Sequence, residues 1–429
     1  MSLIESRNIS AFLASKRTSF VIKAAIASFI TYLSMYAFRK PFTAATYDGY
    51  TVWGVDYKIL LILSQLVGYT LSKYIGIKFI AELRQTNRTR FLIGLMLAAG
   101  GSLFLFGLTP YPFNFFWMFC NGIPLGMIWG VVFSYIEGRK HTELLGAVMA
   151  SSFIVSSGIV KGIGKYFLDV VEISEKWMPL ITALSFVPIL IIGIYILDRL
   201  DLPNEEDVAI RTERLPMKRI ERKSFFTTFF FGIFMSILLY LGLTIFRDVR
   251  DNFAVDFWRE LNVSNTPELL IFSEIPIAVF VLLIVASMIW IRNNKIAFFL
   301  VIGIILFSGT LLLISTFLFQ LQILSPLNWM IISGFAMYLP YIAYHTMYFE
   351  RWIAFFRYKS NAGFLMYMAD SFGYLGSTIV LLIKNFTMPE VSWVDYFING
   401  STILGCLIII VSVLLFLYFR SFEKRYNII

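Results

Sequence analysis

The sequence is poor in the residues that build metal centres, nucleophilic sites and disulfide scaffolds. It holds two histidines and two cysteines in 429 residues. Both cysteines, Cys120 and Cys406, lie inside long apolar runs, so a disulfide framework is not expected. So few His and Cys residues leave no metal cluster and no Cys/His nucleophilic pair. We therefore expect no cofactor and no enzymatic activity, including that of a membrane-embedded transferase.

Charged residues are also scarce, which excludes an ordinary soluble domain. They make up 15% of the chain, against 58% hydrophobic residues, whereas soluble domains are about a quarter charged. Apolar runs of roughly 20 residues recur along the chain, which is the length needed to cross a hydrocarbon core of about 30 Å. The alternating pattern of a membrane barrel is missing, so the spans are predicted to be helices.

The apolar runs predict twelve transmembrane helices, and so an all-α membrane protein. The expected spans are 19–46, 58–81, 91–109, 113–135, 144–167, 178–197, 225–247, 268–290, 295–318, 327–347, 362–384 and 398–420. An even number of spans places both termini on one side of the membrane. Residues 1–197 and 225–429 are predicted to form two six-helix bundles related by a pseudo-two-fold axis, joined by a charged linker at 198–224.

Lysine and arginine are distributed unevenly between the two sides of these spans. The side of the termini holds 24 of the 36, and the opposite side holds nine. Because cytoplasmic loops are rich in Lys and Arg, both termini and the linker are expected in the cytoplasm, with the chain in a bacterial inner membrane. This distribution explains most of the net charge of +9, so nucleic acid is not an expected partner.

Six spans, a charged linker and six more spans resemble the layout of major facilitator transporters, whose halves are repeats. A short internal echo supports this layout. Gly122 in span four, with the segment 135–139 after it, resembles Gly334 in span ten, with 348–351 after it. We therefore expect a monomeric secondary transporter that binds a small anionic substrate within the lipid bilayer.

Ionisable residues inside the spans are candidate site residues, because a charge in lipid is costly unless it faces protein or water. Lys73 lies well inside span two, although its side chain could also reach the headgroups. Lys161 is a possible cavity residue, but it could extend outward together with Lys165. Glu274 and Asp370 are expected to be counter-ions or proton-coupling acids, and the counter-ion role is preferred for Glu274.

Arginines end the first span of each half. Arg39 could be an interfacial anchor, but the helical pattern continues through Thr46, which would place Arg39 inside the bundle. Arg247 and Arg250 end span seven, in a charged cluster that could also be a solvated loop. The segment 250–253 echoes the sequence that begins at Arg39. Two arginines facing each other would bind a dianion, because guanidinium binds phosphate or carboxylate bidentately.

Three short motifs resemble those of the organophosphate:phosphate antiporters, the major facilitator family that includes glycerol-3-phosphate and hexose-6-phosphate transporters. Tyr36-x-x-Arg39-Lys-x-Phe is similar to that family's first-helix motif, whose Arg binds the substrate phosphate. The segment 68–74 is similar to its second-helix motif, which supplies a cavity Lys at Lys73. The segment 371–376 is similar to its eleventh-helix Phe-Gly-Tyr-Leu-Gly.

The resemblance leaves one choice open and has one clear departure. A gap-free count back from Arg259 matches the family's seventh-helix phosphate Arg to Arg247, whereas the internal echo favours Arg250. The family's fifth-helix substrate His falls near Phe153, so that residue is missing and Lys161 is the cation nearby. The resemblance implies exchange of a phosphorylated organic anion against inorganic phosphate.

The resulting prediction is alternating-access transport of a small, phosphorylated organic anion. Arg39 and one of Arg247 or Arg250 would clamp the anionic group, and Lys73 would add positive charge. The tyrosines expected to contact the organic part are Tyr36, Tyr69 and Tyr341. Two alternatives stay open, which are proton-coupled transport of a non-phosphorylated anion and a membrane sensor of phosphorylated metabolites that has kept the transporter fold.

Overall fold

The computed structural model describes most of the chain. The described residues are 3–81, 83, 85–136, 142–201, 219–263, 266–288, 290–356, 362–388 and 390–425. Most of the predicted linker lies outside these ranges, so the linker and the division of the chain into domains stay predictions.

The two halves of the chain are built from helices. The N-terminal half contains α1 (Leu3–Ala37), η1 (Pro41–Ala44), α2 (Tyr57–Ala81), η2 (Gln85–Asn87), α3 (Arg88–Leu108), α4 (Phe115–Ile136), α5 (Thr142–Asp169), α6 (Met178–Ser185) and α7 (Val187–Asp198). The C-terminal half contains α9 (Arg219–Thr228), α10 (Phe230–Asn252), α11 (Ala254–Glu260), α12 (Pro267–Phe272), α13 (Ile275–Met288), α14 (Asn294–Gln320), α15 (Pro326–Ala343), the π-helical turn η3 (Tyr344–Tyr348), α16 (Phe349–Phe356), α17 (Ala362–Thr387) and α18 (Trp393–Arg425). In the described ranges, strand structure is limited to an antiparallel hairpin of β1 (Thr51–Val52) and β2 (Val55–Asp56).

Most of these helices can cross a membrane. Nine in the described ranges are long and apolar enough, and the bent pair of α6 and α7 makes a tenth. The predicted spans 327–347 and 362–384 form α15 with η3, and α17, which are not among the ten. Large apolar side chains such as Leu97 and Ile403 are exposed on the bundle, where lipid suits them and water does not. The chain is therefore a multi-pass membrane protein.

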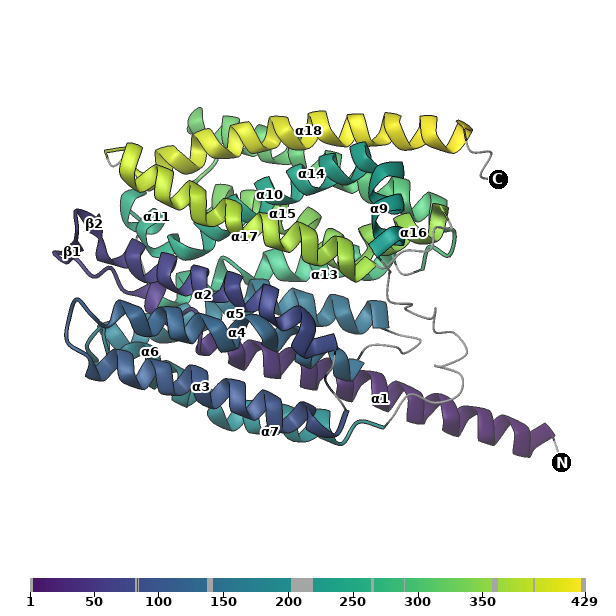
Figure 1. Cartoon of the computed structure of the whole chain (residues 1–429), viewed down its shortest axis with the longest axis horizontal. Helices are drawn as coiled ribbons and strands as arrows, with labels where there is room; N and C mark the ends of the chain where they lie inside the picture. Colours follow the sequence, from purple (N-terminus) through teal and green to yellow (C-terminus); the bar gives the residue numbers. More distant parts are fainter. Residues whose placement is uncertain are drawn as a thin grey trace.

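Figure 1 shows the two halves as two layers of helices. α10, α14, α17 and α18 lie in one layer, and α1 to α7 lie in the other. The layers meet where α2 packs on α17 and where α5 packs on α12 and α13. Both termini lie at one end of the bundle, here called the terminal end, and β1 and β2 lie at the opposite hairpin end. The shared end of the termini agrees with the predicted even number of spans.

The first span is not the continuous helix that the sequence suggested. α1 ends at Ala37, and the short η1 begins only at Pro41. Proline has no backbone N–H and disfavours helical geometry in the residue before it. The expectation of an unbroken helix through Thr46 was therefore wrong, and Arg39 lies at the break.

The break in the first span is sealed by two buried amide side chains. The Asn121 side chain of α4 donates a hydrogen bond of 3.2 Å to the carbonyl oxygen of Phe38. The Gln65 side chain of α2 donates one of 2.9 Å to the carbonyl oxygen of Arg39, and another to Asn121. Because a buried carbonyl without a partner is costly, these bonds allow the chain to leave helical geometry inside the bundle.

The seventh span is longer than predicted. α10 continues past the expected end at 247 as far as Asn252, and α11 follows from Ala254. Arg247, Arg250 and the two aspartates beside them are all buried. The alternative reading of this cluster as a solvated loop was therefore wrong, because these charges pair with residues inside the bundle.

The two glycines of the internal echo allow neighbouring helices to pack closely. A Cβ atom on Gly122 in α4 would lie 2.2 Å from the backbone oxygen of Gln65 in α2. A Cβ atom on Gly334 in α15 would lie 2.7 Å from the guanidinium carbon of Arg250 in α10. Neither distance leaves room for a side chain, so glycine fixes the spacing of one helix pair in each half.

Candidate functional site

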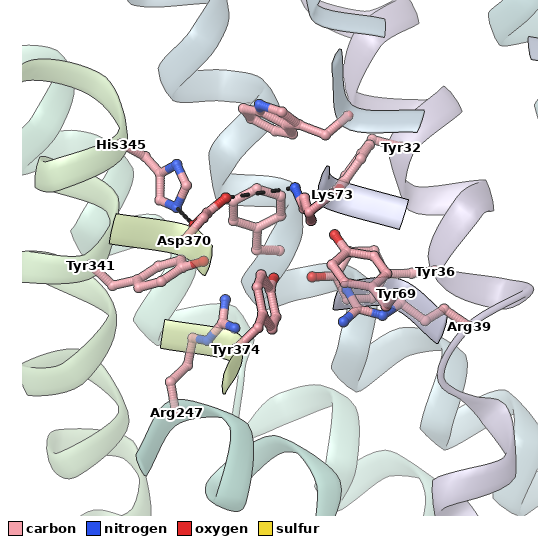
Figure 2. A pocket seen from close by; sticks show the side chains of 12 residues that line it. Tyr32, Tyr36, Arg39, Tyr69, Lys73, Arg247, Tyr341, His345, Asp370 and Tyr374 are labelled. Carbon is pink, nitrogen blue, oxygen red and sulfur yellow. Dashed lines mark ion pairs between the residues drawn. The ribbon is translucent and has the colours of Figure 1, made fainter. Parts of the chain in front are cut away.

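A cavity of about 280 Å³, here called the central pocket, lies between the two halves. Its lining residues are Tyr32, Tyr36, Arg39, Tyr69, Lys73, Trp129, Phe153, Arg247, Tyr341, His345, Asp370 and Tyr374. Figure 2 shows these side chains converging from helices of both halves. The pocket thus combines cations, one carboxylate and many aromatic rings.

Arg39 enters the central pocket from the break after α1. Its side chain is buried, and its guanidinium carbon lies 3.9 Å from the ring centroid of Tyr69 and 5.9 Å from that of Tyr36. Within the described part of the chain, the guanidinium has no carboxylate partner and donates no hydrogen bond, and its Nε is buried. A buried guanidinium stays charged, so Arg39 presents an uncompensated positive charge. The alternative of an interfacial anchor was therefore wrong.

Arg247 reaches the same pocket from α10 in the other half. Its Nη2 lies 2.5 Å from an oxygen of Asp248, and its guanidinium carbon lies 4.1 Å from the ring centroid of Tyr341. The second oxygen of Asp248 accepts a hydrogen bond of 2.9 Å from Ser377. Arg247 is therefore held by a carboxylate and a ring at a position where it lines the pocket.

Lys73 and Asp370 connect the two halves across the pocket. Lys73 is buried, and its Nζ lies 3.6 Å from Asp370 Oδ2 and 5.3 Å from the ring centroid of Tyr69. The alternative in which Lys73 reaches the headgroups was therefore wrong. At 3.6 Å the pair attracts electrostatically but is too long for a direct hydrogen bond. An anion in the pocket could therefore draw Lys73 away from Asp370.

His345 and Tyr240 complete the surroundings of Asp370. Tyr240 donates a hydrogen bond to Asp370 Oδ1, and its hydroxyl oxygen lies 2.6 Å from Nε2 of His345. Because a phenol has one proton, Nε2 of His345 must donate when Tyr240 donates to Asp370. His345 lies in the π-helical turn η3. This arrangement could move a proton between Asp370 and His345 through the Tyr240 hydroxyl.

A second cavity of about 230 Å³ adjoins the central pocket and shares Arg39 and Arg247 with it. Beside it, Asp251 of α10 binds two lysines of the N-terminal half, Lys40 at 2.5 Å and Lys161 at 3.1 Å. Lys161 is buried, so its expected outward extension was wrong, and it is not among the residues that line either cavity.

Arg250 and Glu274 form a separate pair within the C-terminal half. Arg250 Nη1 donates to Glu274 at 2.8 Å, and its Nη2 donates to the carbonyl oxygen of Met330 at 3.0 Å. Glu274 lies at the break between α12 and α13. Neither residue lines the central pocket. This is the geometry of a structural arginine with its counter-ion.

Two further ion pairs join the halves at the hairpin end. Lys58 at the start of α2 lies 2.6 Å from Asp256 of α11, and both side chains are buried. Arg259 lies 3.2 Å from Asp48, and these two side chains are largely exposed. Together with the bonds to Asp251, these pairs hold the halves together on the hairpin side of the pocket.

The central pocket brings together seven of the ten site residues that the sequence suggested. These are Tyr36, Arg39, Tyr69, Lys73, Arg247, Tyr341 and Asp370. The three that lie elsewhere are Lys161, Arg250 and Glu274. Of the two candidate arginines of span seven, Arg247, which the gap-free count matched, lines the pocket, and Arg250 does not.

Sequence reasoning missed five residues of the lining. These are Tyr32, Trp129, Phe153, His345 and Tyr374. For three of them a signal was present, because they lie four residues from a residue already singled out: Tyr32 from Tyr36, His345 from Tyr341, and Tyr374 from Asp370. Residues four apart share a helix face. Phe153 had a different signal, because the resemblance places the family's fifth-helix substrate His near it. Trp129 gave no signal, because it does not lie near an intramembrane charge in the sequence.

The part of the chain that the structure describes offers no group of three His, Cys, Asp or Glu residues able to hold a metal ion. The chemistry of the central pocket is therefore that of its cations, its single carboxylate and its rings. Such a set suits the binding of an anion.

Solved structures share this arrangement of helices. A D-xylose–proton symporter matches with a TM-score of 0.61 at 14% identity, over 93% of this chain and 97% of the symporter. The major facilitator proton:xylose symporter XylE, bound to 6-bromo-6-deoxy-D-glucose, matches with a TM-score of 0.60 at 12% identity, over 93% and 96% of the two chains. A bacterial homologue of the human drug peptide transporters PepT1 and PepT2 gives 0.60 at 10% identity, over 95% and 99%. The predicted all-α major facilitator fold is confirmed, and identities this low show the fold alone.

Comparisons of the sequence itself give a family. None of the curated proteins compared with the chain matches it. Residues 41–422 match the model of a family described as "Family of unknown function (DUF5690)". That match runs from the start of η1 almost to the end of α18. The chain therefore belongs to this family of unknown function, DUF5690.

Proposed function

We propose that the protein is a secondary active transporter that moves a small organic anion through the central pocket. The observation that carries the proposal is the buried guanidinium of Arg39, which has no carboxylate partner among the described residues. Burying an uncompensated charge costs on the order of several kcal/mol, and an anionic ligand would remove that cost. The structural neighbours, which are described as a proton symporter for xylose and a homologue of peptide transporters, support transport as the activity.

The charges beside the pocket favour a doubly negative ligand, such as a phosphate ester. Lys40 and Lys161 share the single carboxylate of Asp251, and Arg39 has none. Three cations thus face one carboxylate, which leaves an excess of two positive charges. A phosphate group between Arg39 and Arg247 would balance that excess, and the guanidinium groups suit its bidentate binding.

Residues of both halves would hold this ligand, as alternating access requires. Arg39 and Lys73 belong to the N-terminal half, and Arg247 and Asp370 belong to the C-terminal half. When the halves rock apart at one end, the groups that clamp the ligand separate as well. Binding and release are thereby linked to the movement of the halves.

Exchange against inorganic phosphate is the mode of transport that we propose. An empty pocket would leave its cations uncompensated, which disfavours reorientation of the unloaded protein. The resemblance of the segments around Arg39 and Lys73 to the organophosphate antiporters supports the same mode. One observation favours the alternative of proton coupling, because Asp370 is connected to His345 through Tyr240.

We also propose that the protein works as a monomer in a bacterial inner membrane, with both termini in the cytoplasm. The orientation in this proposal rests on the excess of Lys and Arg on the side of the termini. A reporter fused after Ile429 should then give a cytoplasmic signal, and a periplasmic signal would reverse the orientation.

The test of the binding site is the affinity of purified Arg39→Lys protein for inorganic phosphate. Lysine keeps the charge but lacks the planar fork. Loss of one partner in a buried charge-assisted pair costs about 2–5 kcal/mol, so we expect at least roughly tenfold weaker binding. Arg199→Lys is a matched control, because Arg199 lies 3.9 Å from the ring of Tyr195 but at an exposed position. Binding by Arg39→Lys as tight as that of the control would overturn the site.

A further inference from the structure

We propose that the ligand of the central pocket carries a planar, apolar ring beside its anionic group, as an aryl phosphate or an aromatic dicarboxylate does. The proposal rests on the proposed function, in which Arg39 and Arg247 hold the anionic group. It adds the chemical class of the rest of the ligand. The aromatic side chains that line the pocket away from these arginines assign that class.

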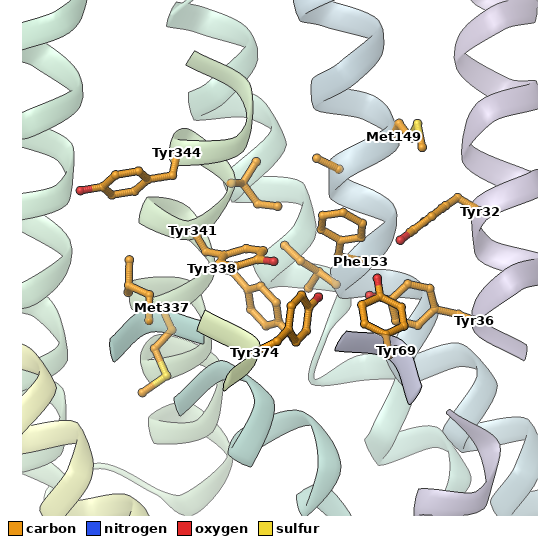
Figure 3. Close-up of a cluster of buried hydrophobic side chains, with 14 of the residues drawn as sticks. Tyr32, Tyr36, Tyr69, Met149, Phe153, Met337, Tyr338, Tyr341, Tyr344 and Tyr374 are labelled. Atoms are coloured by element: carbon orange, nitrogen blue, oxygen red, sulfur yellow. The ribbon is translucent and has the colours of Figure 1, made fainter. Parts of the chain in front are cut away.

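Three rings of the N-terminal half, Tyr32, Trp129 and Phe153, form what we call the aromatic wall of the pocket. The ring centroid of Phe153 lies 4.8 Å from that of Trp129 and 5.3 Å from that of Tyr32. Across the boundary between the halves it lies 6.4 Å from the ring of Tyr341 and 6.0 Å from that of His345. Figure 3 shows Phe153 between Tyr341 and Tyr32. A ligand ring in the pocket would therefore meet aromatic faces from both halves.

Most of the aromatic wall lies away from the arginines, although Phe153 also lines the second cavity that both arginines border. Figure 2 shows Arg39 and Arg247 on the side opposite Tyr32. Arg39 already covers the ring of Tyr69, and Arg247 covers that of Tyr341. Among the described residues, no Lys or Arg lies over the rings of the aromatic wall. The rings of the wall pack on one another, and Trp129 also stacks on Phe133 with ring centroids 6.0 Å apart. A ligand ring would meet the parts of the wall that line the pocket, in the offset or edge-to-face geometry that aromatic pairs prefer.

The neutral hydrogen-bonding groups of the lining all belong to aromatic side chains. Of the described residues that line the pocket, none is Ser, Thr, Asn or Gln, so these groups are tyrosine hydroxyls, an imidazole and an indole N–H. A ligand that bonds to them therefore also lies against aromatic rings.

The experiment measures dissociation constants of the purified full-length chain for two charge-matched pairs of anions and for inorganic phosphate. One pair is phenyl phosphate and glycerol phosphate, and the other is phthalate and malate. Stacking on the aromatic wall should make the ring-bearing member bind about tenfold more tightly than its hydroxyl-bearing partner. The pair that binds more tightly also identifies the anionic group as phosphate or carboxylate.

Phe153→Leu tests the aromatic wall directly, because leucine keeps an apolar side chain but removes the ring. We expect the preference for phenyl phosphate over glycerol phosphate to fall below about threefold. Phe106→Leu is the matched control, since Phe106 is fully buried in α3 and lies outside the pocket. Phe153→Met serves the same purpose if Phe153→Leu does not fold, because methionine fills irregular space in a core.

The possible outcomes separate the two proposals. Binding of inorganic phosphate without any preference for the ring-bearing anions would overturn the aromatic ligand and leave the anion site intact. Tighter binding of glycerol phosphate would overturn it as well, as would a preference that survives in both Phe153 variants. Absence of binding by all five anions would instead overturn the proposed anion site itself.

Discussion

The two halves of the bundle contribute different charges to the buried interior. The N-terminal half contributes cations, which are Arg39, Lys40, Lys58, Lys73 and Lys161. In the described ranges, every buried carboxylate comes from the C-terminal half, and these are Asp248, Asp251, Asp256, Glu274 and Asp370. The buried ion pairs that join the halves therefore run in one direction, from N-terminal cations to C-terminal acids, whereas the exposed pair of Arg259 with Asp48 runs in the other.

The arginines of the two halves differ in the same way. In the C-terminal half, Arg247 pairs with Asp248 and Arg250 pairs with Glu274, so each has a carboxylate from its own half. Arg39 has none among the described residues. The comparison teaches that the C-terminal half is electrically close to balanced, whereas the N-terminal half needs acids from its partner half or from a ligand.

The largest effect should follow from removing the carboxylate on which two N-terminal lysines depend. Asp251→Asn leaves Lys40 and Lys161 buried without a carboxylate, and we expect it to lower the free energy of unfolding by about 3–5 kcal/mol. The thermal unfolding midpoint of the purified protein measures this loss. Asp169→Asn is the control, because Asp169 pairs with Lys165 on the surface. An equal midpoint for both variants would contradict the importance of these inter-half pairs.

A smaller effect is expected where the ion pair lies within the C-terminal half. Glu274→Gln keeps a hydrogen-bond acceptor for Arg250 but removes the charge, so the loss of stability should be about 1–3 kcal/mol. The pH dependence of uptake should stay unchanged, since Glu274 is a counter-ion and does not line the pocket. Glu268→Gln, at an exposed position, serves as the control. A shifted pH profile with normal stability would make Glu274 a coupling acid instead.

Substitution of Asp370 tests whether an anionic ligand can take the place of a C-terminal carboxylate as the partner of Lys73. Asp370→Asn removes the negative charge opposite Lys73, so the pocket should bind inorganic phosphate more tightly, by up to about tenfold. Equilibrium binding measures this change. Phosphate exchange in vesicles should proceed without a proton gradient in the wild type and in the variant.

The opposite result would reassign Asp370. If the wild type accumulates anions in response to a pH gradient, and Asp370→Asn abolishes that response while exchange persists, then proton coupling is the correct mode. Ser371→Ala provides a control for substitution at this point of α17.

The smallest effect is expected at the exposed pair of the hairpin end. Burial alone would raise the pKa of Asp48, but hydrogen bonds from Thr46 and Arg259 hold it below its ordinary value. The pair therefore stabilises the protein at neutral pH, and this contribution is lost as the pH falls below the ordinary pKa of aspartate, about 4. Arg259→Gln should cost less than about 1 kcal/mol, and 1 M salt should remove the difference. A larger loss of stability that 1 M salt does not change would show that this exposed pair contributes as much as the buried ion pairs.

Much of the fold could be predicted from the sequence because lipid imposes a simple rule on composition. Apolar runs gave the spans, and rare charges inside them gave Arg39, Lys73 and Asp370 as pocket residues. The break after α1 was harder to predict. Pro41 is visible in the sequence, but Gln65 and Asn121, which make the break tolerable, lie on other helices.

The choice between the arginines of span seven needed the structure. The internal echo favoured Arg250, but Arg250 turns toward Glu274 and Met330 within its own half, and Arg247 lines the pocket. Helical phase separates the two residues, and a short echo cannot fix that phase. His345 lies four residues from Tyr341, but the sequence does not show that it lies in a π-helical turn, which changes the helical register locally.

The uncompensated guanidinium of Arg39 also has an electrical meaning. Moving one uncompensated elementary charge across the full thickness of the membrane, at a potential of about 100 mV, changes its energy by about 2.3 kcal/mol. The empty protein would respond to that potential whenever its halves move, whereas a protein loaded with a divalent anion would respond less. Exchange of one divalent anion for another would then carry no current, and voltage would act on the unloaded conformations alone.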